Sequence, residues 1–429
     1  MSVPSQLLNY PRAAIRRLIP KDDDFVRQSS LVFSATMIAN VCNYIYQIFV
    51  GRMLGPEAYG IFGALFAIFY LIGVFTGTIQ AGVGFFISKF KTENDTEQVN
   101  SFLQQLILKS MLLGIAGFLV FALISPWIAG FLNSESPWEV IIVGMGFLFT
   151  FLLPVTTGAF QGLQRFKEMS ASTVISVLAK LGFAVILIFA GYSIYGALGA
   201  VTLGSLAATV YSLWVLRDRL KSGKNCKARD FSALYSYSLP TLLVIFCLNV
   251  PSNLDVILVT HFLPNYDAGL YVSASELGKI VLFVSSAIAL VMFPKVAEMR
   301  ALHRDPRPLL KRSLLLTGAL SGAVAACLII FPGIVSLLFG KAYLDAEGIT
   351  APYAVMMFAF ALTTVIAQYC LAVRNMHFGI FLFAVTVLEM VLVWFIHSSV
   401  FEIAFTLMLT NLILFIASYC IVIRKAYSD

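Results

Sequence analysis

The sequence predicts an all-α polytopic membrane protein, with twelve transmembrane helices in two six-helix lobes related by a parallel repeat. Three observations lead to this prediction. Hydrophobic residues make up 59% of the 429 residues and charged residues only 12%, which is more apolar surface than a soluble core can bury. The apolar residues gather in segments of about 20 residues, the length that crosses a bilayer. The first half of the chain also resembles the second half.

Twelve apolar segments qualify as spans, six in each half. They cover residues 29–51, 58–80, 101–123, 139–160, 170–190, 194–215, 236–262, 269–292, 312–336, 351–373, 377–397 and 400–423. The resulting division is an N-terminal segment over 1–27, an N-lobe over 28–216, a cytoplasmic linker over 217–230 and a C-lobe over 231–429. The N-terminal segment does not resemble a signal peptide, because it has no short apolar core before a small-residue cleavage site. It either lies on the inner leaflet or forms a disordered basic tail.

The repeat is clearest around the first helix of each half. Residues 40–62, NVCNYIYQIFVGRMLGPEAYGIF, match residues 249–271, NVPSNLDVILVTHFLPNYDAGLY, without a gap. Asn40, Leu54 and Gly60 each meet an identical residue 209 positions later. A second echo lies near the end of each third span, where PWIAGFL in the first half resembles PGIVSLL in the second. Chance resemblance between apolar segments is the alternative, but paired polar residues and a shared turn favour duplication. Both echoes run in the same direction, which indicates a parallel repeat.

The distribution of basic residues predicts the orientation. Only Arg52 and Lys341 fall in predicted outer loops, and only Lys109, Lys180 and Lys279 fall within spans. The rest of the 29 Lys and Arg residues lie in predicted inner segments, as expected when positive charge stays in the cytoplasm. We therefore expect a multi-pass protein of the cell membrane, with both termini cytoplasmic. The net charge of +7 reflects this orientation and gives no reason to expect nucleic-acid binding.

Polar side chains form a stripe on the first helix of each lobe. Asn40, Asn43 and Gln47 are spaced three and four apart, so all three lie on one helical face. Asn249 and Asn253 make a similar stripe in the second lobe. Such stripes often only hold membrane helices together. Their repetition in both lobes favours a shared substrate-binding surface, and we predict these five residues as substrate contacts.

Three lysines inside spans are candidates for binding an anionic group. Lys109, Lys180 and Lys279 lie where an ionised side chain is costly and usually faces protein or water. Lys109 is nearer the cytoplasm and is long enough to extend to the interface. Arg165 and Lys167 follow the fourth span and are expected at the inner mouth.

Three carboxylates inside spans occur only in the second half. Asp255, Glu276 and Glu389 are expected in the seventh, eighth and eleventh helices, and the repeat places Tyr46 where the second half has Asp255. Glu276 with Lys279 can form a purely structural pair. The three carboxylates can equally hold a proton or ligate sodium. We predict a coupling cation, Na⁺ or H⁺, and no other cofactor.

Several features argue against an enzyme. No predicted outer loop exceeds about a dozen residues, and the chain has no phosphate-binding glycine loop. No spacing of His, Asp or Glu indicates a metal site or a catalytic triad. A membrane-embedded component of glycan synthesis is therefore a weaker alternative.

Four motifs together resemble a known family. They are GRMLGPEAYGIF after the first span, FQGLQRFK after the fourth, LDVILVTHFLPNYDAGLYVSA in the seventh and eighth, and LLFGKAYLDA after the ninth. In this order they resemble the polysaccharide transporter family, the O-antigen and teichoic-acid type flippases of the multidrug/oligosaccharidyl-lipid/polysaccharide exporter superfamily. The resemblance implies two lobes around a cavity that opens alternately to each side. Many relatives, including the peptidoglycan-precursor flippases, have fourteen spans, so twelve spans disfavour that substrate.

The resemblance implies a flippase for polyprenyl-pyrophosphate-linked oligosaccharide. In this hypothesis the lysines bind the headgroup, while the amide stripes and Tyr44, Tyr46 and Tyr271 contact sugars. Expected partners are the lipid-linked oligosaccharide and membrane lipids, with glycosyltransferases or a polymerase of the same pathway as further candidates. A cation-coupled drug or organic-cation antiporter of the same superfamily is the main alternative, although three intramembrane lysines argue against it.

Overall fold

The computed structural model describes residues 22–93, 95–221, 246, 249–302, 304–373 and 375–426. Within these ranges the chain folds into helices and short connections and contains no strand. Residues 1–21 of the predicted N-terminal segment, residues 222–230 of the predicted linker and most of the seventh span before residue 249 lie outside the described residues.

The N-lobe begins with α2 (Asp22–Thr92), which contains the first two predicted spans. Gly55, with φ 75° and ψ 169°, breaks this element into two antiparallel helices, because a left-handed φ is available to glycine without steric cost. The remaining elements are α3 (Thr96–Leu123), α4 (Ser125–Phe131), α5 (Pro137–Thr150), α6 (Leu153–Gly162), α7 (Phe166–Leu187), η2 (Ile188–Tyr192) and α8 (Ser193–Lys221). The fourth span is thus divided between α5 and α6, and Pro154 lies in the first turn of α6.

The C-lobe repeats this order. Its elements are α10 (Pro251–Phe262), α11 (Asn265–Ala301), α12 (Arg307–Ile330), α13 (Ile334–Phe339), η3 (Lys341–Ala346), α14 (Glu347–Ala372), α15 (Met376–Phe395) and α16 (Val400–Ala426). Eight helical stretches in the described chain are long and apolar enough to cross a membrane. Two of them, 30–92 and 166–220, each contain two predicted spans, and α10 and α11 supply the seventh and eighth. The predicted fold class, twelve helices in two lobes, is confirmed.

Both sequence echoes correspond to repeated structure. PWIAGFL and PGIVSLL fall on the short helices α4 and α13, which follow the third helix of each lobe. At the crossing of α2 and α11, a Cβ on Gly60 would lie 2.9 Å from the Gly269 nitrogen, and one on Gly63 would lie 2.5 Å from a Val272 methyl. The residues in each pair are 209 positions apart, and equivalent residues touch one another only near a two-fold axis. A pseudo-two-fold axis therefore passes through this crossing.

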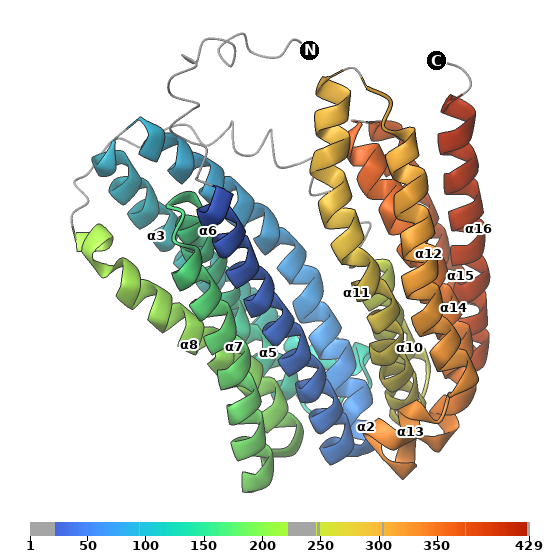
Figure 1. Cartoon of the computed structure of the whole chain (residues 1–429). Coiled ribbons are helices and arrows are strands. Elements are labelled where there is room, and N and C mark those ends of the chain that lie inside the picture. Colours follow the sequence, from blue (N-terminus) through green and yellow to red (C-terminus); the bar gives the residue numbers. More distant parts are fainter. Residues whose placement is uncertain are drawn as a thin grey trace.

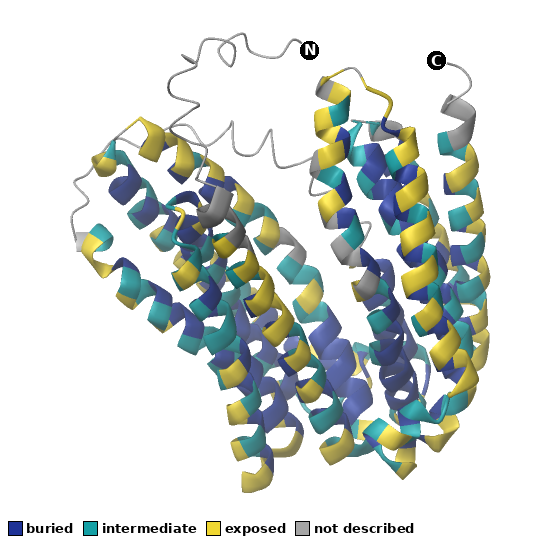
Figure 2. Cartoon of the chain, viewed as in Figure 1, coloured by how far each residue is buried: buried dark blue, intermediate teal, exposed yellow. Residues whose placement is uncertain are grey.

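The lobes meet at one end and diverge at the other (Figure 1). We define the outer end by Gly55, α4 and α13, and the inner end by the start of α2 and the end of α16. One buried apolar cluster joins both lobes towards the outer end, and it includes Tyr59 and Phe62 of the N-lobe and Phe339 and Tyr343 of the C-lobe. Towards the inner end, two separate clusters belong to one lobe each. The burial pattern in Figure 2 follows this division. Each lobe is therefore a separate body at the inner end.

Candidate substrate and cation sites

Matched hydrogen bonds close the outer end. Asn133, in the connection after α4, donates to the Thr260 carbonyl at 3.0 Å. Tyr343, in the segment after α13, donates its hydroxyl proton to the Gly51 carbonyl at 2.6 Å. Thr260 and Gly51 are 209 residues apart, so each lobe binds the equivalent carbonyl of the other. The His261 ring adds a stacking contact with Phe131, with centroids 3.9 Å apart. The outer end is thus sealed by a pair of related contacts.

Lys180 is a buried cation in the N-lobe. Its ammonium donates to Asn43 Oδ1 and lies 4.3 Å from the centroid of the Tyr46 ring, close enough for a cation–π interaction. Gly204 allows α8 to approach α7 here, because a Cβ at this position would lie 2.8 Å from the Lys180 Cβ. Lys180 is 8% exposed. No carboxylate of the described chain forms a salt bridge with it, so its charge is balanced only by neutral groups at close range.

Glu276 and Lys279 lie on the C-lobe side of the same region. Their side chains form an ion pair of 2.7 Å on successive turns of α11, each about one-seventh exposed. Tyr44 of the N-lobe donates to the Glu276 carbonyl at 3.4 Å. Glu276 and Lys180 are within electrostatic range of one another. We call Asn43, Tyr44, Lys180, Glu276 and Lys279 the inter-lobe cluster.

Asp255 is held inside the C-lobe by two tyrosines. Its Oδ2 accepts hydrogen bonds from the Tyr271 hydroxyl at 2.9 Å and the Tyr353 hydroxyl at 2.8 Å. The Tyr353 hydroxyl also lies 3.0 Å from Ser275 Oγ. Asp255 is 4% exposed and within electrostatic range of Lys279. A buried carboxylate is costly unless it is hydrogen-bonded in this way, so the two tyrosines stabilise Asp255 inside the C-lobe.

Glu389 is the second buried carboxylate of the C-lobe. It lies on α15, which packs against α10, and it is within electrostatic range of Asp255. Asn411 of α16 donates to Glu389 Oε1 at 2.8 Å. The Oδ1 atom of Asn411 is buried and has no hydrogen-bond partner among the described residues. Carboxylate and amide oxygens are suitable ligands for a hard cation, so Asp255, Glu389 and Asn411 form a candidate cation site.

The other predicted contact residues are more dispersed. Lys109 is exposed on α3, which packs chiefly on other N-lobe elements, so the structure does not bring it to Lys180. Asn253 of α10 donates to the carbonyl of Asn249, four residues earlier, at 2.8 Å. Gln47 is buried and its Oε1 has no partner in the described chain, while Asn40 is half-buried. Their predicted roles in binding substrate remain predictions.

Two of the aromatic residues suggested for sugar contacts are completely buried. Tyr46 donates to the Ala197 carbonyl at 2.8 Å, and Tyr271 is bonded to Asp255. Tyr44 is half-buried and is the one of the three placed at the inter-lobe surface. At the predicted inner mouth, Arg165 forms an ion pair of 2.7 Å with Glu168.

Sequence reasoning missed the partners of the carboxylates. Tyr353 and Asn411 were not predicted, although both are polar residues inside predicted spans. A lone amide such as Asn411 within an apolar helix is a usable signal, because membrane spans rarely retain one without a partner. The carboxylate to which Asn411 donates is determined by the packing of α15 against α16, which the sequence does not reveal.

The chain is similar to proteins of known family and structure. A family model described as "Polysaccharide biosynthesis protein" matches residues 25–300. An uncharacterised membrane protein of Methanocaldococcus jannaschii is 22% identical over 337 residues, covering 75% of this chain and 78% of that protein. These sequence similarities extend over both lobes.

Two solved structures share the fold. One is an inward-facing multidrug resistance MATE family transporter of the MOP superfamily, with a TM-score of 0.78 and 13% identity, covering 93% of this chain and 98% of that chain. The other is the lipid II flippase MurJ in an inward closed conformation, with a TM-score of 0.75 and 15% identity over 91% and 87%. The chain therefore belongs to the polysaccharide biosynthesis protein family, and its two lobes have the fold of the MOP superfamily.

Proposed function

We propose that this protein is a flippase that moves polyprenyl-pyrophosphate-linked oligosaccharide across the cytoplasmic membrane by alternating access. It belongs to a family described by polysaccharide biosynthesis, and one protein of the same fold is a lipid II flippase. We also propose that both termini face the cytoplasm, because the basic residues concentrate in the segments at the inner end. No covalent step is required of it.

The buried environment of Lys180 is the observation that best supports a substrate with a phosphate headgroup. A buried ammonium without a carboxylate partner has an unsatisfied charge, and a phosphate oxygen would satisfy it through a charge-assisted hydrogen bond. Lys180 lies on the N-lobe side of the inter-lobe cluster. A substrate between the lobes would therefore contact residues of both lobes. Lys279, already paired with Glu276, would exchange that partner for phosphate as the headgroup enters.

The arrangement of the lobes supports the transport mechanism. The outer end is closed by matched contacts, and the inner ends are separate bodies, so this structure represents a state open towards the inner end. Breaking the outer contacts while forming inner ones would expose the same site to the opposite leaflet. Only a few kcal/mol of differential binding is needed to shift such an equilibrium.

We further propose that Asp255, Glu389 and Asn411 bind the coupling ion, Na⁺ or H⁺. The Oδ1 atom of Asn411, which has no hydrogen-bond partner among the described residues and lies next to a buried carboxylate, supports this proposal. The charges alternate from Lys180 to Glu276, Lys279 and Asp255 across the interface. A cation at the site would weaken the attraction of Lys279 to the C-lobe interior, and so make it available to a phosphate.

The substrate proposal is tested with purified protein in vesicles that contain a fluorescent lipid-linked oligosaccharide or a cationic dye. We expect flipping of the lipid-linked sugar and not of the dye. Lys180→Gln/Lys279→Gln should abolish flipping, and Lys180→Arg should retain part of it. Dye transport by the wild type would favour the antiporter, and formation of a new glycan would favour the synthesis enzyme. Wild-type flipping by the double variant would exclude the proposed role of the lysines.

The coupling proposal is tested by imposing proton or sodium gradients on the same vesicles. An inward gradient should accelerate flipping by the wild type, while Asp255→Asn and Glu389→Gln should flip at a rate that no gradient changes. Unaltered gradient dependence in both variants would show that the carboxylates are structural.

A further inference from the structure

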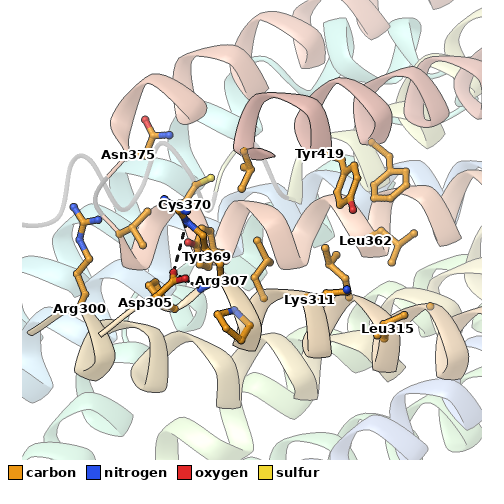
Figure 3. A pocket seen from close by; sticks show the side chains of 18 of the residues that line it. Arg300, Asp305, Arg307, Lys311, Leu315, Leu362, Tyr369, Cys370, Asn375 and Tyr419 are labelled. Atoms are coloured by element: carbon orange, nitrogen blue, oxygen red, sulfur yellow. Dashed lines mark hydrogen bonds and ion pairs between the residues drawn. The ribbon is translucent and has the colours of Figure 1, made fainter. Parts of the chain in front are cut away.

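A large cavity lies outside the inter-lobe cluster, at the inner end of the C-lobe (Figure 3). Its volume is about 1160 Å³, and its walls are formed by α12, α14 and α16 with the corner between α11 and α12. α12 and α16 both pack on α14, and the cavity separates them. The functions proposed above do not use it.

The cavity has a basic end and an apolar end. Arg300, Arg307 and Lys311 line the end near the corner, and all three side chains are exposed. Asp305 lies 3.6 Å from Arg307 Nε, so one carboxylate is set against three cations. Farther along α12, the lining consists of aliphatic and aromatic side chains together with small residues. They include Leu314, Leu315, Gly318, Ala319, Leu362 and Phe415.

The corresponding part of the N-lobe is closed. There α3 and α8, the counterparts of α12 and α16, pack on each other as well as on α5. Gln104 of α3 donates to the Leu220 carbonyl of α8, which fastens the two helices together at the inner end. The open space is therefore a feature of one lobe and does not follow from the repeated fold.

We propose that this cavity binds an anionic phospholipid of the membrane, with the phosphate held by Arg300, Arg307 and Lys311 and one acyl chain between α12 and α16. A cationic rim beside an apolar slot matches a molecule with an anionic head and a hydrocarbon tail. Guanidinium groups bind phosphate with two parallel hydrogen bonds. A free phosphate would leave the apolar walls uncovered, and a zwitterionic lipid would leave excess positive charge at the rim.

Native mass spectrometry of the intact protein, released from detergent with added lipid, tests the proposal. We expect at least threefold more phosphatidylglycerol than phosphatidylcholine to be retained per molecule. Arg307→Gln/Lys311→Gln should remove this preference, whereas Arg312→Gln, an exposed basic residue on the same helix that does not line the cavity, should keep it.

A second variant addresses the apolar end. A Cβ on Gly318 would have no atom within 4 Å, so Gly318→Leu should fill the slot without a backbone clash and reduce phosphatidylglycerol retention at least threefold. Gly182→Leu, at an equally open helical position in the N-lobe, is the control and should have no effect. Melting temperatures establish that each variant is folded.

The remaining outcomes overturn the proposal. Equal retention of both lipids by the wild type, or equal losses in Arg312→Gln and the double variant, would remove the specific site. If millimolar inorganic phosphate displaces phosphatidylglycerol and Gly318→Leu does not reduce its retention, the cavity is a simple anion site. Displacement by lipid-linked oligosaccharide at equimolar concentration would show that the cavity belongs to the transported substrate.

Discussion

The N-lobe and the C-lobe share one fold but have ionisable side chains of opposite type at corresponding places. Lys180 lies 14 residues after the first residue of α7, Phe166, and Glu389 lies 13 residues after the first residue of α15, Met376. These are the fifth spans of their lobes. Each ionisable group is bonded to a buried or half-buried asparagine, Asn43 in one lobe and Asn411 in the other. The two lobes therefore place a basic and an acidic side chain at nearly equivalent depths.

This contrast separates what the repeat preserves from what it does not. The contacts of the outer end are matched in kind between the lobes, because both lobes must close on the same axis. The ionisable sites differ, since the proposed function assigns an anionic headgroup to one and a cation to the other. We infer a division of labour in which Lys180 of the first lobe and Lys279 of the second bind the substrate headgroup, while the buried carboxylates of the second lobe bind the ion.

The largest effect on the conformational equilibrium is expected at the crossing of α2 and α11. A Cβ on Gly269 would collide with the backbone of Pro56, and one on Gly60 would lie 2.5 Å from the Asn265 carbonyl oxygen. Overpacking of about 1–3 kcal/mol would shift the lobe equilibrium roughly 5- to 150-fold towards an open outer end. Spin labels at the exposed positions Glu97 and Glu298 should therefore report a shorter inner distance in Gly60→Ala and Gly269→Ala.

Gly77→Ala is the matched control for the glycine variants, because nothing lies within 4 Å of its added Cβ. Its label distance should equal that of the wild type. If Gly60→Ala and Gly269→Ala act in opposite directions, the pseudo-two-fold axis does not govern closure of the outer end.

Ligand binding should divide between the lobes. Lys180→Gln removes a charge-assisted contact of about 1.5–3 kcal/mol, so the affinity for lipid-linked oligosaccharide should fall about 10- to 150-fold while stabilisation by the coupling ion persists. Asn411→Ala should have the converse effect, because it removes a proposed ion ligand. Isothermal titration measures the affinity of each variant for each ligand. Thermal unfolding in sodium or potassium salts at several pH values measures stabilisation by the coupling ion. If each variant loses affinity for both the lipid-linked oligosaccharide and the coupling ion, the two sites are not separate.

The matched hydrogen bonds of the outer end should each have a moderate effect. Asn133→Ala and Tyr343→Phe each remove a contact of about 0.5–1.5 kcal/mol, which predicts a shift of a few-fold towards the outer-open state in the same spin-label measurement. Tyr266→Phe, which loses a hydroxyl contact within the C-lobe, should leave the distribution unchanged. A large effect of only one of the two bonds would show that the seal is not shared equally.

The smallest effect is expected at the Arg165–Glu168 pair at the start of α7. Its side chains are 36% and 28% exposed, and exposed pairs typically contribute about 0.2–1 kcal/mol. Arg165→Gln should therefore lower the melting temperature by only a few degrees in low salt and less in high salt. Loss of flipping in this folded variant would instead support the predicted role of Arg165 at the inner mouth.

The fold could be predicted from the sequence because the signals are local. Gly55-Pro56 marks the outer turn within α2, and Gly60 and Gly269, which match in the repeat, are the residues that meet at the two-fold crossing. The site was harder to predict. Asp255 is bonded to Tyr353, 98 residues away, and Lys180 to Asn43, 137 residues away. Such contacts depend on how each helix is rotated about its axis, which apolar spans with nearly uniform faces do not reveal.

Because the lobes are joined at the outer end, a small rotation there produces a large movement at the inner end of each lobe. The helix from Asp22 to Leu54 is about 50 Å long, so turning it by roughly 10° about its outer tip sweeps the far tip through about 9 Å. Gly55 joins it to the following helix through a single non-helical residue, which leaves no slack for the two to slide independently. A small change of angle at the contact between Gly60 and Gly269 therefore produces a much larger displacement at the inner end, and this amplification comes from helix length alone.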